Sequence, residues 1–249
     1  MSNVNSHVQI PKFILKNFED KKQRLFYYDF KDKKIKTGHA ATLNTVMGYY
    51  SEEIENFLSN IVEQPFSKFV EQAKKFKTGE LIVIDEKVKT AVFRYLYSLM
   101  TRGTVYLDEF LKESKTACLF QSQDLHDFGV HVGITGLENA KFFQDSVITL
   151  GINNTNTPLL LPNIGYCECD GMVIMPITPA IAVVLVHDRK ERVSENGKHF
   201  FLALDTDESV FNLNYRLFIN EMNNVRYVTA TNKHQLEKMV EKLKIDGRL

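Results

Sequence analysis

The sequence contains no tryptophan and only three cysteines, and its 31 basic residues balance 31 acidic ones. The three cysteines, Cys118, Cys167 and Cys169, make a poor disulfide framework, which favours a reducing, intracellular compartment. Zero net charge gives the whole chain no field that would attract nucleic acid or an anionic membrane. The first residues lack the basic and apolar segments of a secretory signal, so we expect a cytoplasmic protein.

The sequence also lacks the local motifs of several enzyme classes. It contains neither Gly-x-Ser-x-Gly, nor the phosphate loop Gly-x-x-x-x-Gly-Lys, nor His-Glu-x-x-His. A Cys–His nucleophile pair needs partners that meet only in space, and no local signature marks one. The sequence therefore identifies no cofactor and leaves open whether the protein is an enzyme.

A Cys-x-Cys pair, Cys167 and Cys169, is followed by Asp170 and is similar to half a metal site. A structural zinc site needs four ligands, typically from two short knuckles. No second Cys/His knuckle stands at suitable spacing, since His126 and His131 are five positions apart. We therefore expect no metal site and interpret the pair as small residues at the start of a strand.

The most apolar and β-branched stretch is 170–187, and two prolines interrupt it. Its apolar runs, 172–177 and 180–186, predict two strands joined at a tight corner. Continuous apolar runs of this length are typical of strands that are covered on both faces. The stretch is too short and too interrupted to span a bilayer. We expect it to form the centre of the core, and we expect no membrane partner.

Helical patterns dominate the first half of the chain. Residues 8–18 predict a short amphipathic helix. Ser51 and Asp85 each cap a longer helical period, and Pro65 predicts a kink or a junction between two helices near 64–66. We expect the long helices of the region 51–113 to cover one face of a sheet.

Strand patterns dominate the second half. The candidate strands are 147–150, 159–161, 172–177, 180–187 and 200–204. A helix is predicted over 137–145, another begins at Ser209, and a last helix capped by Asn232 follows a strand at 225–229. Helices grouped early and strands grouped late predict an α+β fold, with a largely antiparallel late sheet, in a single domain over residues 1–249.

Residues 24–30 and 35–37 predict an N-terminal hairpin around a lysine-rich turn. Basic residues outnumber acidic ones between 21 and 36, and two tyrosines lie among them. Such a surface could hold a nucleic-acid backbone and stack a base. The alternative is a hairpin whose exposed edge is protected from pairing by lysines, and the zero net charge of the chain favours this alternative.

Four segments share the order of one family's motifs. Ile10-Pro-Lys-Phe-Ile-Leu-Lys-Asn-Phe18 follows His7, Tyr27-Tyr-Asp29 lies in a predicted strand, Tyr49-Tyr-Ser51 precedes a helix, and Arg102 stands near the end of the central helix. They resemble a mainly bacterial family of domains of unknown function with an N-terminal His-Tyr-Val-Pro motif, whose pattern is His-x-x-Pro-x-Phe-x-Leu-x-x-Phe. His7 lies four positions before the proline, one more than this pattern has.

Later segments continue the resemblance. Asn154-Thr-Asn-Thr-Pro158 is similar to a Thr-Ser-Asp-Asn-Pro motif, with Asn156 in place of the aspartate. Met175-Pro-Ile-Thr-Pro179 is similar to Phe-Pro-Leu-Ser-Pro, and Leu213-Asn214 to a late Leu-Asn pair. The resemblance spans roughly residues 7–240. It implies a shared fold unit and no particular reaction, since the activity of the family is not established.

The polar residues in these motifs are His7, Arg102, Asn156 and Asn214, and we expect them to form one candidate binding cleft. Arg102 would offer a bidentate donor fork to a carboxylate or phosphate, and His7 could transfer a proton near neutral pH. Asn156 cannot act as a general base as an aspartate would, so the cleft favours binding an anion over cleaving it. The alternative is that Arg102 ties helix ends to carbonyl groups and Asn156 forms a turn.

Two functions are compatible with these observations. The first is an intracellular, effector-like protein that acts on or binds a nucleic acid, a nucleotide or another anionic ligand in the His/Arg/Asn cleft. The second is a non-catalytic protein–protein interaction module that has lost an acidic residue at position 156. They differ in whether Asn156 faces His7 and Arg102 in one pocket or lies in a separate surface turn.

Overall fold

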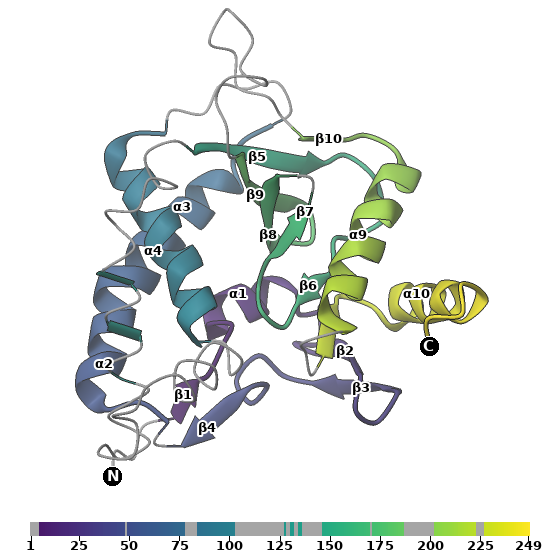
Figure 1. Ribbon diagram of the computed structural model, residues 1–249, viewed down its shortest axis with the longest axis horizontal. Coiled ribbons are helices and arrows are strands. Elements are labelled where there is room, and N and C mark those ends of the chain that lie inside the picture. Colours follow the sequence, from purple (N-terminus) through teal and green to yellow (C-terminus); the bar gives the residue numbers. More distant parts are fainter. Residues whose placement is uncertain are drawn as a thin grey trace, which may run out of the picture.

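The computed structural model (Figure 1) describes residues 5–47, 49–77, 84–102, 146–169, 171–186, 202–222 and 227–249, together with residues 127, 130, 131, 134 and 135. The predicted helix over 137–145 lies outside these residues. Cys118, His126 and the part of the 51–113 region that follows residue 102 also lie outside them.

A five-stranded sheet runs through the middle of the molecule (Figure 1). Its order is β10 (Leu202–Leu204), β5 (Val147–Asn153), β9 (Ile181–Val186), β8 (Met172–Thr178) and β7 (Cys167–Cys169). The strands β8 and β9 are the two apolar runs of the sequence, and they pair antiparallel around a tight corner, as predicted. Their register shifts between Pro176 and Thr178, because proline lacks the N–H group that a regular ladder needs.

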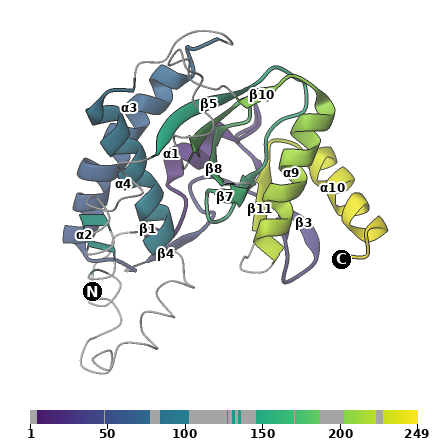
Figure 2. The ribbon, with the colours of Figure 1, turned by 45° about the horizontal axis from the view of Figure 1, so that its top comes forward.

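The described helices form an N-terminal and a C-terminal group. The first contains α1 (Lys12–Asn17), α2 (Glu52–Phe57), the π-helix η1 (Leu58–Glu63), α3 (Gln64–Ala73) and α4 (Glu86–Arg102). The second contains α9 (Asp207–Met222) and α10 (Lys233–Ile245). Figures 1 and 2 show the blue helices α2 to α4 on one side of the five-stranded sheet and the green and yellow helices α9 and α10 on the other.

Both faces of the five-stranded sheet are covered, which confirms the prediction from its apolar strands. Successive side chains of a strand point to opposite faces. In β9, Val183 and Leu185 join a buried cluster with residues of α1, α3 and α4. Val184, between them, joins a second cluster with residues of α9 and α10. The sheet therefore contributes to two hydrophobic clusters at once.

The helical run that Ser51 caps changes its winding before Pro65. The Ser51 Oγ accepts a hydrogen bond from the N–H of Ile54 at 3.2 Å, which confirms the predicted cap. A proline ring crowds the carbonyl four residues earlier and offers that carbonyl no N–H. The turn ahead of Pro65 is the π-helix η1, whose wider i→i+5 winding avoids this clash. The predicted junction near 64–66 is confirmed, since α3 begins at Gln64.

The long helix α4 packs at the centre of the first cluster. Asp85 caps it as predicted, its Oδ1 accepting from the N–H of Val88 at 2.8 Å. Leu96 is fully buried on its apolar face. Gly165, with a φ of 82°, lies against Leu99, and a Cβ at that glycine would come within 2.8 Å of the Leu99 Cδ1. The close approach of α4 to this turn therefore requires glycine.

A four-stranded sheet contains the predicted N-terminal hairpin. Its order is β3 (Lys34–Gly38), β2 (Leu25–Asp29), β11 (Tyr227–Ala230) and β6 (Leu161–Pro162). The strand β3 lies at the edge and carries Lys34 and Lys36. Lys36 forms ion pairs with Asp29, at 2.7 Å, and with Asp32. These pairings occupy part of the basic surface and favour the interpretation of the lysines as edge protection.

Some elements differ from the predictions. The strands β1 (Asn5–His7) and β4 (Thr45–Met47) pair antiparallel, and neither was expected, because three residues are too few for an alternating pattern to stand out. Of the predicted strand 159–161, only Leu161 belongs to β6. The helix α9 begins two positions before the predicted Ser209, whose N–H bonds to the Oγ1 of Thr206 at 3.1 Å.

The structure confirms the α+β fold. Among the described strand pairs, only β10 with β5 is parallel, so the sheets are largely antiparallel, as predicted. The final helix α10 is capped by Asn232, whose Oδ1 accepts from the N–H of Gln235 at 2.9 Å, again as predicted. Within the described residues, no helix combines the length and the apolar character needed to cross a membrane. The single-domain organisation stays a prediction.

Candidate functional site

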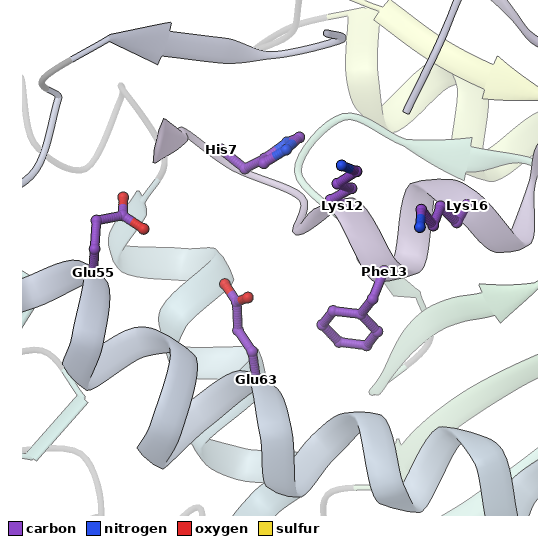
Figure 3. Close-up of a pocket in the computed structure, with 6 residues that line it drawn as sticks. All are labelled: His7, Lys12, Phe13, Lys16, Glu55 and Glu63. Carbon is purple, nitrogen blue, oxygen red and sulfur yellow. The ribbon is translucent and has the colours of Figure 1, made fainter. Parts of the chain in front are cut away.

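A pocket of about 300 Å³ opens between the N-terminal segment and the helices α2 and η1 (Figure 3). Its lining residues are His7, Lys12, Phe13, Lys16, Glu55 and Glu63. They come from three elements far apart in the sequence: the end of β1, the short helix α1 and the helical run α2–η1. Five of the six carry an ionisable group, and the Phe13 ring and the aliphatic stems of the long side chains add apolar surface.

The helix α1 supplies the cationic side of the pocket. Ile14 and Leu15 are buried against the first hydrophobic cluster. Lys12 and Lys16 lie four positions apart, one above the other on the exposed face. In the part of the chain that the structure describes, neither lysine has an ion-pair or hydrogen-bond partner. In Figure 3 both lysines lie across the pocket from the helix that carries Glu55 and Glu63.

The winding of η1 places two carboxylates on the same pocket. In a regular α-helix, residues eight positions apart differ by about 80° around the axis, because each residue advances by about 100°. The wider π-helical turns between Glu55 and Glu63 reduce the advance per residue. Both glutamates therefore line the pocket, and Figure 3 shows both carboxylates on its side of the helix.

Arg102 lies behind Glu63 and fixes its position. Its Nη2 donates to the Glu63 Oε1 at 2.8 Å, and its Nη1 donates to the backbone oxygen of Gln9 at 3.3 Å. The arginine side chain is 1% exposed and that of Glu63 28%. Burial works against the charge of Arg102, but the neighbouring groups Glu63 and Tyr50 outweigh it and raise the arginine pKa. Arg102 is thus a buried cation that orients a pocket carboxylate.

His7 lies at the end of β1 beside these charges. Burial lowers its pKa below the ordinary value of 6.5, Glu63 opposes this shift, and Lys12 and Arg102 add to it. The imidazole is therefore neutral near neutral pH and can accept a proton. Its Nδ1 is buried and has no hydrogen-bond partner among the described residues. Buried polar groups are rarely left unsatisfied in native proteins.

The structure separates the four residues predicted from sequence motifs into two pairs. His7 and Arg102 meet around Glu63. Asn214 is fully buried in α9, where its Nδ2 donates to the Pro158 oxygen and its Oδ1 accepts from the N–H of Leu160, both at 2.8 Å. It holds the turn that follows Asn156. Whether any of the four binds a ligand stays a prediction.

Asn156 is exposed and lines a different pocket, of about 450 Å³. This second pocket lies at the N-terminal ends of α9 and α10, and it shares no lining residue with the first. Asp207 at its rim accepts from the Thr157 hydroxyl at 2.7 Å, and this bond lowers the aspartate pKa. Asp207 thus helps to hold the turn on which Asn156 lies, and whether Asn156 has a role beyond that turn stays a prediction.

Sequence reasoning missed the pocket residues on the helices. Lys12 and Lys16 stand four positions apart, which is a signal that could have found them. Glu19 and Asp20 follow Lys16 at similar spacing, but in the structure they bind the N–H of Ala40 and the side chain of Arg24. Glu55 and Glu63 gave no such signal. Eight positions place two residues on the same face of the helix only if part of the helix between them is π-helical, which the sequence does not show. The pairing of Glu63 with Arg102 joins residues 39 positions apart, and no local sequence pattern indicates it.

The Cys-x-Cys pair is placed where the sequence predicted it, on the short strand β7. Cys167 is buried and Cys169 is half-buried, and Arg216 donates a hydrogen bond to the Cys169 Sγ. In the described ranges, no group of three or more His, Cys, Asp or Glu side chains is arranged to hold a metal ion.

Residues 7–129 match the model of a family described as "Protein of unknown function (DUF4238)". The match confirms the resemblance to a family of unknown function, over the first half of the chain. It includes every residue that lines the first pocket, and also Arg102, whereas Asn156 and Asn214 lie beyond it. No curated protein and no solved structure matches the chain.

Proposed function

We propose that this protein binds a phosphate-bearing ligand, such as a nucleotide or a nucleic-acid phosphate, in the pocket lined by His7, Lys12, Lys16 and Glu63. The observation that carries the proposal is the pair of lysines on α1. They extend over one pocket and have no carboxylate partner among the described residues. A phosphate group could take the place of that partner, since lysine ammonium groups are common phosphate binders.

The charge of the pocket supports an anion. The lining residues Lys12 and Lys16 balance Glu55 and Glu63, and the buried Arg102 behind the pocket adds one positive charge, a balance of 3 − 2 = +1. The negative charge of Glu63 is matched by its ion pair with Arg102. The neutral His7 beside them can donate one hydrogen bond and can take up a proton when an anion approaches. The volume of about 300 Å³ is at the lower end for small-molecule sites.

The proposal gives Arg102 an indirect role. Both of its Nη groups already bind protein acceptors, and its side chain does not line the pocket. It therefore acts as a positioning residue for Glu63 and for the backbone near His7. The proposal also includes a cytoplasmic location, which the odd cysteine count and poor disulfide framework of the sequence favour.

Calorimetric titration tests the proposal with three probes: inorganic phosphate, adenosine monophosphate and a short single-stranded RNA. The double variant Lys12→Ala/Lys16→Ala should lose at least about tenfold in affinity for the probe that binds, because charged hydrogen bonds each contribute about 1.5–3 kcal/mol. The matched control is Lys21→Ala/Lys22→Ala, which removes the same charge from exposed positions near the hairpin.

The three probes separate the possible ligands. Binding of RNA alone would indicate a nucleic-acid backbone, and binding of the mononucleotide a small-molecule site. Absence of binding by every probe would refute the proposal and favour the non-catalytic interaction module. An equal loss of affinity in the control variant would contradict a site confined to the pocket and would indicate that the lysines near the hairpin also bind the probe.

A further inference from the structure

Glu63 has a second carboxylate oxygen that the protein leaves available. Its Oε1 takes the bond from Arg102. Its Oε2 accepts no hydrogen bond and forms no ion pair within the described ranges of the chain, and the Glu63 side chain is 28% exposed. Figure 3 shows the carboxylate directed from η1 toward the side of the pocket where His7 lies. A carboxylate oxygen in this position can only accept a hydrogen bond.

A fully ionised phosphate gains nothing from this oxygen, since it has no O–H group to donate. A carboxylate beside a bound phosphate repels it, so a pocket that served phosphate alone would bind more tightly without Glu63. The structure instead holds the carboxylate in place with a fully buried arginine and aims it through a π-helical turn. The rotamer of Glu63 is therefore fixed before any ligand arrives, which lowers the entropic cost of using it. This arrangement suits a ligand that carries a hydrogen-bond donor next to its phosphate.

The surrounding charges select the type of donor. An ammonium group on the ligand would meet the positive charges of Lys12 and Lys16 in the same pocket. A hydroxyl group is neutral, donates one hydrogen bond and is compatible with both lysines. A hydroxyl that donates to a carboxylate forms a charge-assisted hydrogen bond, which is stronger than one between neutral groups.

We infer that the ligand is a phosphorylated sugar whose hydroxyl donates to the Oε2 of Glu63 while its phosphate binds Lys12 and Lys16. The inference rests on the proposed function and narrows it to a substrate class. A free sugar phosphate and a ribonucleotide share this chemistry, and Glu63 is the residue that distinguishes them from simple phosphates.

The experiment compares matched ligands on the wild-type protein by calorimetry. One pair is ribose 5-phosphate and methyl phosphate, and the other is adenosine monophosphate and its 2′,3′-dideoxy analogue. Within the preferred pair, the hydroxylated ligand should bind about tenfold or more tightly, as expected for one charged hydrogen bond. A preference in the first pair indicates a free sugar phosphate, and a preference confined to the second indicates a ribonucleotide.

Glu63→Gln should reduce this preference strongly while the lysines still bind phosphate, and Glu55→Gln, the other pocket carboxylate, should reduce it less. If Glu63→Gln fails to fold, Glu63→Asp takes its place, because it keeps a counter-charge for Arg102 and withdraws the oxygens by one methylene. Equal binding of hydroxylated and bare phosphates would overturn the inference and leave the proposed function standing. A preference that persists in the folded Glu63 variant would also overturn it. Absence of binding by all four ligands would refute the proposed function itself.

Discussion

The ion pair between Arg102 and Glu63 should show an asymmetric response to mutation. The arginine side chain is 1% exposed and that of the glutamate 28%. Glu63→Gln leaves a buried guanidinium without its counter-charge, and arginine cannot escape this by losing its proton. Removing one partner of a buried pair costs about 3–5 kcal/mol, so we expect Glu63→Gln to destabilise the protein by this amount.

Arg102→Met should cost less. It leaves the Glu63 carboxylate, which its partial exposure allows water to solvate. It also leaves the Gln9 carbonyl without the 3.3 Å bond, a loss of about 1 kcal/mol. Methionine is unbranched and flexible enough to fill much of the space. We expect a total of about 1–3 kcal/mol for this variant.

The double variant Glu63→Gln/Arg102→Met should be close to Arg102→Met alone, because no buried charge remains. The double-mutant cycle formed by these variants would then give a coupling free energy of about 2 kcal/mol or more, within the range measured for residues of one ion pair. Urea unfolding followed by circular dichroism, with a common m-value, measures all three variants. If Glu63→Gln cost less than Arg102→Met, or if the two effects added, the argument from unequal burial would be refuted.

Three further predictions concern the core, the histidine and the cysteines. Leu96→Ala should destabilise by about 2–5 kcal/mol in urea melts, as deletions in a packed core do, and a loss below about 1 kcal/mol would contradict its central place. The folded-state pKa of His7 lies below 6.5, so the unfolded chain takes up the proton first as the pH falls, and the stability of the protein should decrease below pH 6.5. His7→Gln should make stability less dependent on pH, as measured by melts between pH 7 and pH 5, roughly one unit either side of the titration. Chelators should leave the melting temperature unchanged, because Cys167 and Cys169 are interpreted as structural thiols, whereas one equivalent of zinc in purified protein would overturn that interpretation.

Local chemistry in the sequence determined many elements of the fold. The caps of Ser51, Asp85 and Asn232 begin helices where the sequence predicted them, because each cap bonds an N–H only three positions away. The apolar runs that became β8 and β9 could be read from their composition, since strands covered on both faces need no polar side. The short strands β1 and β4 could not, because their pairing is set by the register of distant segments rather than by their own pattern.

The candidate site was recovered only in part, because the motif residues are held by partners that the sequence does not indicate. His7 was predicted, and it lies in the pocket. Asn156 and Asn214 were grouped with it, but the amide of Asn214 closes the turn at Pro158 on another side of the molecule. The order of motifs along a chain says nothing about distances in the fold, so it could not show that these residues lie at two separate sites.

The tertiary structure alone decided which groups meet in the pocket. A π-helical turn, set by Pro65 and by packing, rotates Glu63 toward His7. The end of α4 then places Arg102 behind Glu63, across 39 positions of sequence. The spacing of Lys12 and Lys16 along the chain is enough to put them on one face of a helix, since four positions make about one turn. Their carboxylate and imidazole neighbours come from other elements, and only the packing of those elements against one sheet brings them within reach.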